Sequence, residues 1–197
     1  MLLTFASNMR SVLTPETVLR TAMRVFLITG SVEMRALARE LGIGRATLYR
    51  WHRSRDELLS DVLLALARAN LRRVEQEIGT PPGPRRICHV HDHHIRRISS
   101  NPSLRAFIRA EPELASRLLL DINGRVHRGV TDALADFLRR QEAESEWRAP
   151  LGVDTFARVV SRMSETYIYA DLLGLGEPEA DTPDLIIRLM LGLPIER

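Results

Sequence analysis

The chain has 197 residues, of which 45% are hydrophobic and 27% are charged. This composition is too apolar for a disordered chain, and the length suits one domain or two small ones with a buried core. A single cysteine, Cys88, excludes an internal disulfide framework and is typical of a reducing compartment. Arginines interrupt every hydrophobic run before it reaches the ~20 residues that a membrane span needs, so we expect a cytoplasmic protein with no membrane partner.

The first 60 residues carry the start and stop signals of several helices. Thr14 is a capping residue, Pro15 suits a first helical turn, and Gly30 suits the helix end. Ser54 and Glu57 have the spacing of a capping box at the start of a long helix. Together with the apolar periodicity, these signals predict a first helix that ends at Gly30. They also predict two short helices, at 33–40 and 45–52, joined by a glycine turn, and a long fourth helix at 54–78.

A glycine- and proline-rich break at 79–84 separates this region from a second helical region. Apolar periodicity there predicts helices at 85–99, 102–109, 111–120, 122–146, 154–174 and 182–192. No segment shows the sustained alternation of a strand. The sequence therefore predicts an all-α protein of about nine to ten helices, with an N-terminal tail at 1–13, a helix-turn-helix head at 14–60 and a helical domain at 61–197.

Positive charge is concentrated around the two short helices. All 28 basic residues of the chain are arginines, and residues 1–84 hold 12 of them against 8 acidic residues. Residues 85–197 hold 16 arginines against 17 acidic residues. Between Arg35 and Arg55 there are six arginines and one acidic residue, Glu40, and such a local excess is typical of a surface that binds a polyanion.

Two short helices joined by a tight glycine turn are typical of a helix-turn-helix, whose second helix enters the major groove of DNA. Arginine on guanine is the commonest specific contact there, so we expect Arg45 to read a base and Arg55 to bind a phosphate. A plain helical hairpin in a bundle core is the alternative interpretation. The expected DNA-binding residues are Arg35, Arg45, Ala46, Thr47, Tyr49, Arg50, Trp51, His52 and Arg55.

The DNA-binding domain of TetR-family repressors resembles residues 15–60 in four motifs: Leu37-Ala38, Leu41-Gly42-Ile43, Thr47-Leu48-Tyr49 and Asp56-Glu57-Leu58-Leu59. The resemblance implies an all-helical homodimer that binds operator DNA and a variable C-terminal domain that binds a small effector. In that family, effector binding moves the fourth helix and separates the two heads. Glu33 departs from the family pattern, which often has serine or threonine there, and a carboxylate disfavours a phosphate contact.

Further motifs resemble the QsdR-type branch of these regulators: Tyr49-Arg50-Trp51, Ser54-Arg55, Arg109-Ala110-Glu111-Pro112 and the run from Arg162 to Leu172. That branch is tied to quorum quenching and lactone catabolism, which implies a lactone or an acyl-chain relative as the effector. A pocket for it should be mostly apolar with a few polar groups. The expected effector-binding residues are Leu63, Leu66, Phe107, Ile108, Leu119, Asn123, His127, Arg162, Glu165 and Tyr169. For Arg162 and Glu165, a simple surface pair is the alternative.

In the family, the last long helices pair across a two-fold axis to form the dimer. Two apolar stripes are the candidates here. The first is Val130, Leu134, Phe137 and Leu138, and the second is Phe156, Val160, Met163 and Tyr167. Internal core packing of the same residues is the alternative.

Two other classes of function are open at this stage. Cys88, His89, His91, His93 and His94 lie on one predicted helix, where His89 and His93 are one turn apart, so a metal-responsive regulator is the alternative reading. No second cluster supplies further ligands, so we expect no metal and no cofactor. No nucleophile elbow, phosphate loop or dinucleotide fingerprint is present, so we expect no enzyme. A DNA-binding protein without an effector would not need the long helical region after residue 84.

Overall fold

The computed structural model describes residues 13–195, and this part of the chain forms ten helices and no strand. The predicted all-α fold is confirmed. Of the predicted tail at 1–13, residues 1–12 lie outside the described residues. The helices are α1 (Pro15–Thr29), α2 (Met34–Glu40), α3 (Arg45–Trp51), α4 (Arg55–Glu77), α5 (Pro84–Ser99), α6 (Pro102–Ala110), α7 (Pro112–Leu119), α8 (Arg125–Glu144), α9 (Val153–Ile168) and α10 (Asp181–Met190).

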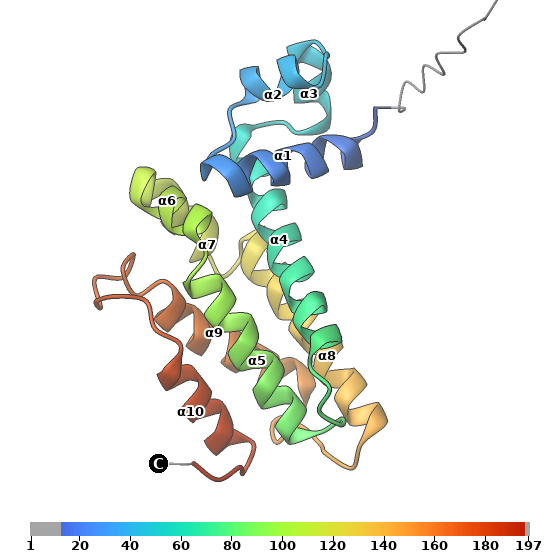
Figure 1. Ribbon diagram of the computed structural model, residues 1–197, viewed down its shortest axis with the longest axis vertical. Coiled ribbons are helices and arrows are strands. Elements are labelled where there is room, and N and C mark those ends of the chain that lie inside the picture. The colour runs from blue at the N-terminus through green and yellow to red at the C-terminus, as the bar shows by residue number, and fades with distance from the viewer. Residues whose placement is uncertain (1–12, 196–197) are drawn as a thin grey trace, which may run out of the picture.

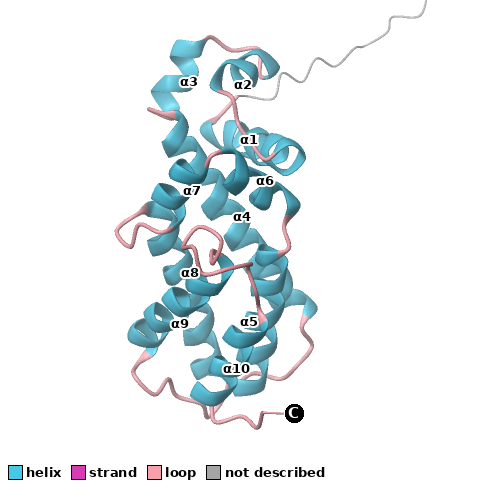
Figure 2. Cartoon of the chain, turned by 90° about the vertical axis from the view of Figure 1, so that its left-hand side faces the viewer, coloured by secondary structure: helices cyan, strands magenta, loops and turns pink. Residues whose placement is uncertain are grey.

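The helices build an elongated molecule with a small head at one end (Figure 1, Figure 2). Helices α2 and α3 form the tip of the head, and α1 crosses beneath them. Helix α4 runs from the head along the rest of the molecule, where α5, α8, α9 and α10 form a bundle with it. Helices α6 and α7 lie between the head and this bundle, so the head is attached to the body through α4 and α6–α7.

The helix ends in the head follow the local signals in the sequence. The Thr14 hydroxyl accepts a hydrogen bond from the Thr17 backbone N–H at 3.3 Å, and Gly30 ends α1 in the left-handed region at a φ of 70°. The Ser54 hydroxyl likewise accepts from the Glu57 N–H at 3.0 Å. These contacts satisfy backbone groups that a helix end would otherwise leave free, which is why the bounds are readable from sequence.

The predicted helix at 154–174 is too long, because α9 ends at Ile168. The chain then turns, with hydrogen bonds from the Leu172 N–H to the Tyr169 carbonyl and from the Leu175 N–H to the Ala170 carbonyl. Glycines at 174 and 176 have φ values of 69° and 113°, which a helix does not accommodate. The apolar residues of this segment therefore continue the helical pattern in sequence without continuing the helix.

Two hydrophobic clusters hold the molecule together. The first joins the head to the upper body, with Val18, Phe26, Leu48 and Leu58 of the head packed with residues of α6, α7 and α9. The second lies at the other end, between the lower part of α4 and α5, α8, α9 and α10. Helix α4 crosses the predicted domain boundary between residues 60 and 61 without a break and contributes to both clusters. None of the helices in residues 13–195 is long and apolar enough to cross a membrane.

Candidate DNA-binding head and ligand cavity

The turn between α2 and α3 fixes the angle between the two short helices. Gly42 adopts a φ of 67°, and the Ile43 N–H donates to the Ala38 carbonyl at 3.0 Å. Leu37 and Leu48 point into the head core and are almost completely buried. Because the inner faces of α2 and α3 are fixed in this way, their outer faces form a rigid surface.

The outer face of α3 carries most of the predicted DNA-binding residues. Arg45, Ala46, Tyr49 and Arg50 are exposed there, and Thr47 is half-buried. Arg35 is exposed on α2. Within residues 13–195, the guanidinium groups of Arg35, Arg45 and Arg50 make no hydrogen bond or ion pair with the protein, so these three cations are available to a polyanion.

Two predicted contacts at the end of α3 do not lie on that surface. His52 is only 6% exposed, and its Nδ1 lies 3.4 Å from the Asp61 carboxylate of α4. Trp51 is half-buried and packs against the head core. The prediction of His52 as a DNA contact is wrong, because His52, the residue after α3, is buried against α4.

Arg55 is used inside the protein, against the prediction of a phosphate contact. Its Nη1 and Nη2 atoms donate to the two carboxylate oxygens of Glu111, both at 2.6 Å. Its Nε donates to the Val32 carbonyl at 2.7 Å, and Nη2 also donates to the Ser31 hydroxyl at 3.1 Å. Arg55 lowers the pKa of Glu111, and Glu111 raises the pKa of Arg55, because the hydrogen bonds between them stabilise both charged forms. Arg55 therefore links the head to the α6–α7 junction.

The head also contacts α6 through α1. The Ser103 hydroxyl donates to the Leu27 carbonyl at 2.6 Å, and the rings of Phe26 and Phe107 meet edge to face at 5.8 Å. A Cβ atom on Gly30 would lie 2.9 Å from the Ser103 carbonyl oxygen and from the Ala106 Cβ, so only glycine fits at this joint. Helix α6 is thus packed directly against the helix that supports the DNA-binding pair.

A cavity of about 560 Å³ lies inside the body, beside α4. Five of the predicted effector-binding residues line it: Leu63, Leu66, Leu119, Glu165 and Tyr169. Its size is in the range of small-molecule sites, about 300–1,000 Å³, and aliphatic side chains form most of its wall. The cavity extends from the α1–α6 joint, at Phe26 and Leu104, to the middle of the bundle, at Phe137 and Val160.

The other predicted effector-binding residues do not line this cavity. Phe107 and Ile108 are buried in the first cluster, and Asn123 is exposed in the loop before α8. His127 and Arg162 lie on the far side of Glu165, where they bond its Oε1 at 2.7 Å and its Oε2 at 3.1 Å. Arg162 is exposed, as the surface-pair alternative expects, but its partner Glu165 is buried, against that alternative. Helical periodicity gives the apolar stripe of α8 and α9 but not the part of it that lines a cavity. This is why only some of the predicted effector-binding residues lie on the cavity wall.

The sequence prediction missed the contribution of α5. His91 and His94 are buried and line the cavity together with Val90, Ile95 and Ile98. His91 Nε2 lies 2.8 Å from the Ser164 hydroxyl, and the Asn70 amide donates to His94 Nδ1 at 2.8 Å. Burial lowers the pKa of His91 to about 4 and that of His94 to about 3, so both rings are neutral at pH 7. Their spacing with Ile87 and Ile98, on one helix face, was the available signal.

The cysteine and histidines of α5 point to different partners. The Cys88 thiol donates to Asp184 at 3.1 Å, and His89 Nδ1 lies 2.8 Å from the Thr80 hydroxyl. His93 is exposed, while His91 and His94 face the cavity. Burial raises the pKa of the Cys88 thiol to about 12, so it stays protonated. No group of three or more His, Cys, Asp or Glu side chains in the described residues is placed to hold a metal ion.

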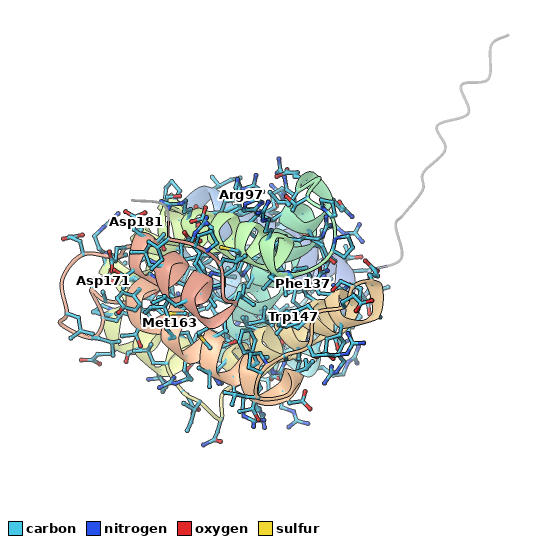
Figure 3. The ribbon with its side chains drawn as sticks, turned by 90° about the horizontal axis from the view of Figure 1, so that it is seen from below. Arg97, Phe137, Trp147, Met163, Asp171 and Asp181 are labelled. Carbon is cyan, nitrogen blue, oxygen red and sulfur yellow. The ribbon has the colours of Figure 1, made fainter. Side chains whose placement is uncertain are left out.

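Most of the predicted dimer stripe lies inside a single chain. Phe137, Leu138, Phe156 and Val160 are at most 2% exposed, and they pack in the second cluster. Val130 and Leu134 line the cavity. Figure 3, seen from the end opposite the head, shows the helix of Phe137 packed with that of Met163. The prediction of a dimer interface at these four buried residues is wrong, because they pack in the core of a single chain. Met163 and Tyr167 are half-buried.

A basic helix-turn-helix head on a helical body with an internal apolar cavity defines the class of ligand-responsive transcriptional regulators. The family model for the C-terminal domain of tetracycline-repressor-like proteins matches residues 82–192. The chain therefore belongs to the TetR family. No curated protein matches it.

The solved structures that are similar to this chain include two TetR-family repressors. The R. erythropolis transcriptional repressor QsdR, from the TetR family, is 29% identical, with a TM-score of 0.83 over 93% of this chain and 96% of that one. The TetR family repressor AlkX from Dietzia sp. strain DQ12-45-1b, implicated in biodegradation of n-alkanes, is 18% identical, with a TM-score of 0.66 over 91% and 94% of the two chains. The likeness to AlkX shows the fold alone, whereas the likeness to QsdR agrees with the motifs of that branch.

Proposed function

We propose that the protein is a homodimeric repressor that binds operator DNA through its head and leaves the DNA when a small effector fills the cavity. The observation that carries this proposal is the course of α4. Its first two turns hold Arg55 and Leu58 in the head, and its middle places Leu63, Leu66 and Asn70 on the cavity wall. A ligand that prefers a different position of α4 would therefore move the head.

DNA binding in this proposal uses the outer face of α3 and the start of α2. Arg45 reads a base in the major groove, Thr47, Tyr49 and Arg50 contact bases or the backbone, and Arg35 binds a phosphate. The support is their exposure and the free guanidinium groups of the three arginines. Arg55 and His52 are not part of this set.

Fluorescence anisotropy on DNA from the protein's own promoter region tests this assignment. Arg45→Ala should weaken operator binding by about 1–3 kcal/mol and reduce the preference for operator over random DNA. Arg85→Ala is the matched control, because it removes the same charge at the start of α5, away from the head. Equal losses on operator and random DNA, or equal effects of the two variants, would contradict Arg45 as a base reader.

The effector in this proposal is a neutral molecule with a hydrocarbon part, of the lactone or acyl-chain kind. The cavity wall is largely aliphatic, and the buried histidines His91 and His94 are neutral. Glu165, the carboxylate on the wall, is already bonded through both oxygens to His127 and Arg162. The protein acts by binding in the cytoplasm and not by catalysis. Release from promoter DNA by one member of a panel of γ-lactones and acyl-homoserine lactones tests this part.

The second copy in this proposal docks on the outer face of α8 and α9. A shallow cleft there is lined by Arg128, Asp132, Asp154 and Arg158, together with Ile122 and Ala135. Charges of both signs on one patch suit a two-fold interface, where the same patch meets itself. Sedimentation velocity tests the interface. Arg158→Glu should shift the protein from dimer to monomer, whereas Arg85→Glu, the same charge change on α5, should not.

A further inference from the structure

Two uncharged polar atoms on the cavity wall have no hydrogen-bond partner among the described residues. His91 Nδ1, on α5, and the Ser161 hydroxyl, on α9, are both buried, and neither makes a hydrogen bond within the described residues. The His91 and Ser161 side chains are 6% and 5% exposed. Leaving a buried polar atom without a partner costs about 1–3 kcal/mol, so such atoms call for an explanation.

The two atoms lie in the same part of the cavity. His91 Nε2 is bonded to Ser164, which is three residues after Ser161 on α9 and therefore on the same side of that helix. The ring of His91 is held by this bond, so its other nitrogen is fixed in direction. When the Ser164 hydroxyl donates to Nε2, the neutral His91 ring carries its proton on Nδ1, so this N–H and the Ser161 hydroxyl can both donate to a carbonyl oxygen.

The two unpartnered atoms lie in the part of the cavity away from the head. His91 and Ser161 follow Val90 and Val160, which belong to the second cluster, far from the head. The head-side end is walled by apolar residues of the first cluster, among them Phe26, Leu63, Leu119 and Ile168. Both ends of the cavity carry apolar residues, and Asn101 and Tyr169 also lie on the head-side part of the lining, but the two uncharged atoms without a partner lie away from the head.

The charged side chains on the cavity lining are already engaged in ion pairs, Glu165 with His127 and Arg162. Arg73 and Arg97 are on the cavity lining, but both donate to Glu77, at 2.8 and 2.5 Å. One nitrogen of Arg97, Nη1, has no partner, so a carboxylate bound beside Arg97 is the competing arrangement. The deep pair, in contrast, is uncharged and favours a neutral group.

We propose that His91 and Ser161 bind the carbonyl group of a neutral ester-type effector such as a lactone, and that its hydrocarbon part extends toward the head. This inference rests on the proposed function for the identity of the cavity as an effector site. The hydrocarbon part then contacts Phe26 of α1 and Leu63 of α4, the two helices that carry the helix-turn-helix. A long chain therefore acts on the head, whereas a short ring compound occupies only the part of the cavity beside His91 and Ser161.

Isothermal titration calorimetry on the full chain, without DNA, tests the carbonyl site. The probes are γ-decanolactone, its hydrocarbon counterpart hexylcyclopentane, and decanoate. Ser161→Ala should weaken γ-decanolactone about tenfold, since one hydrogen bond is lost, and should leave hexylcyclopentane unchanged. Ser99→Ala, which removes a buried hydroxyl without a partner outside the cavity lining, should change neither. His91→Phe keeps a ring and should reproduce the loss for the lactone.

Three results would overturn the inference. Ser161→Ala and Ser99→Ala could have the same effect, decanoate could bind the wild type more tightly than γ-decanolactone, or no probe could bind. Circular dichroism checks that each variant is folded, and Ser161→Ala should be at least as stable as the wild type because it removes an unpaired group. Operator binding is measured separately on promoter DNA, so a failure to bind DNA counts against the proposed function and leaves the calorimetric result intact.

Discussion

The head and the body are both built from helices, but they differ in how completely the helices fill the space between them. In the head, Val18, Ala22, Leu48 and Leu58 are completely buried, and three free arginines are held on a rigid outer face. The body leaves a cavity of about 560 Å³ between its amphipathic helices. A filled core keeps a DNA-reading surface in one shape, whereas an incompletely filled one can adapt to a ligand. In the proposed function, this difference assigns DNA binding to the head and effector binding to the body, and α4 connects the two.

The largest expected effect concerns acid, and it should arise in the body. His91 and His94 have pKa values lowered to about 4 and about 3 by burial, against an unfolded value near 6.5. As the pH falls below 6.5, the unfolded chain takes up protons that the folded chain does not, so the free energy of unfolding should fall until the pH reaches the folded pKa values. The loss should amount to a few kcal/mol in total by about pH 4.5.

Urea unfolding between pH 7.5 and 4.5 measures this loss. The double variant His91→Gln/His94→Gln should flatten the dependence, whereas His93→Gln, at an exposed position of the same helix, should not. The carboxylates with lowered pKa values, such as Glu111 and Asp184, lose their stabilisation only below about pH 4.5. An unchanged pH dependence in the double variant would show that these rings do not control acid stability.

The ease of predicting the two regions from sequence differs for the same physical reason. The head follows from local signals: Thr14, Gly30, Gly42 and Ser54 set helix ends and a turn through contacts within four residues. The cavity depends on which sides of α5, α8 and α9 meet, and periodicity gives the stripe but not its partner. The wall residues on α5 were missed for this reason, and Phe137 was assigned to a dimer face.

The same limit applies inside the head. Arg55 has the position of a phosphate contact in sequence, yet its partner Glu111 lies 56 residues away. His52 follows the exposed residues of α3, yet its side chain is buried beside Asp61 of α4. Both errors come from pairings across helices that no local pattern contains.

The next largest effect on stability is expected at the contact between α1 of the head and α6. Gly30 and Gly42 have nearly the same φ, 70° and 67°, so alanine should cost about 1–2 kcal/mol at either position from backbone strain. At Gly30 the new Cβ also meets the Ser103 carbonyl and Ala106 of α6, which should add roughly 1–3 kcal/mol. At Gly42 no atom lies within 4 Å. Thermal unfolding of the two variants measures the difference, and equal losses would argue against a tight α1–α6 joint.

Filling a core position tests the difference in packing directly. Ala22→Leu, in the head core, should destabilise the protein by about 1–3 kcal/mol, because no space exists for the added atoms. Ala67→Leu, on the cavity wall, should change the free energy of unfolding by less than about 0.5 kcal/mol and should weaken effector binding. Chemical denaturation of both variants checks this, and a similar loss at both sites would contradict an adaptable body.

The smallest effect concerns the ion pair that joins the two regions. Both side chains are partly exposed, so a double-mutant cycle with Arg55→Gln and Glu111→Gln should give a coupling of about 1 kcal/mol. Because Arg55 is bonded to Glu111, Arg55→Gln should leave the salt dependence of DNA binding unchanged. A slope lower by about one would instead restore Arg55 as a phosphate contact.

The coupling of cavity and head is tested most directly by the operator affinity of one protein sample with and without γ-decanolactone. Fluorescence anisotropy at fixed salt measures this affinity, and calorimetry confirms that the cavity is saturated. The account predicts that the Kd for operator DNA rises at least tenfold in the wild type and stays nearly constant in Ala67→Leu at the same lactone concentration. An operator affinity that is unchanged when the wild-type cavity is saturated would contradict the coupling of cavity and head through α4.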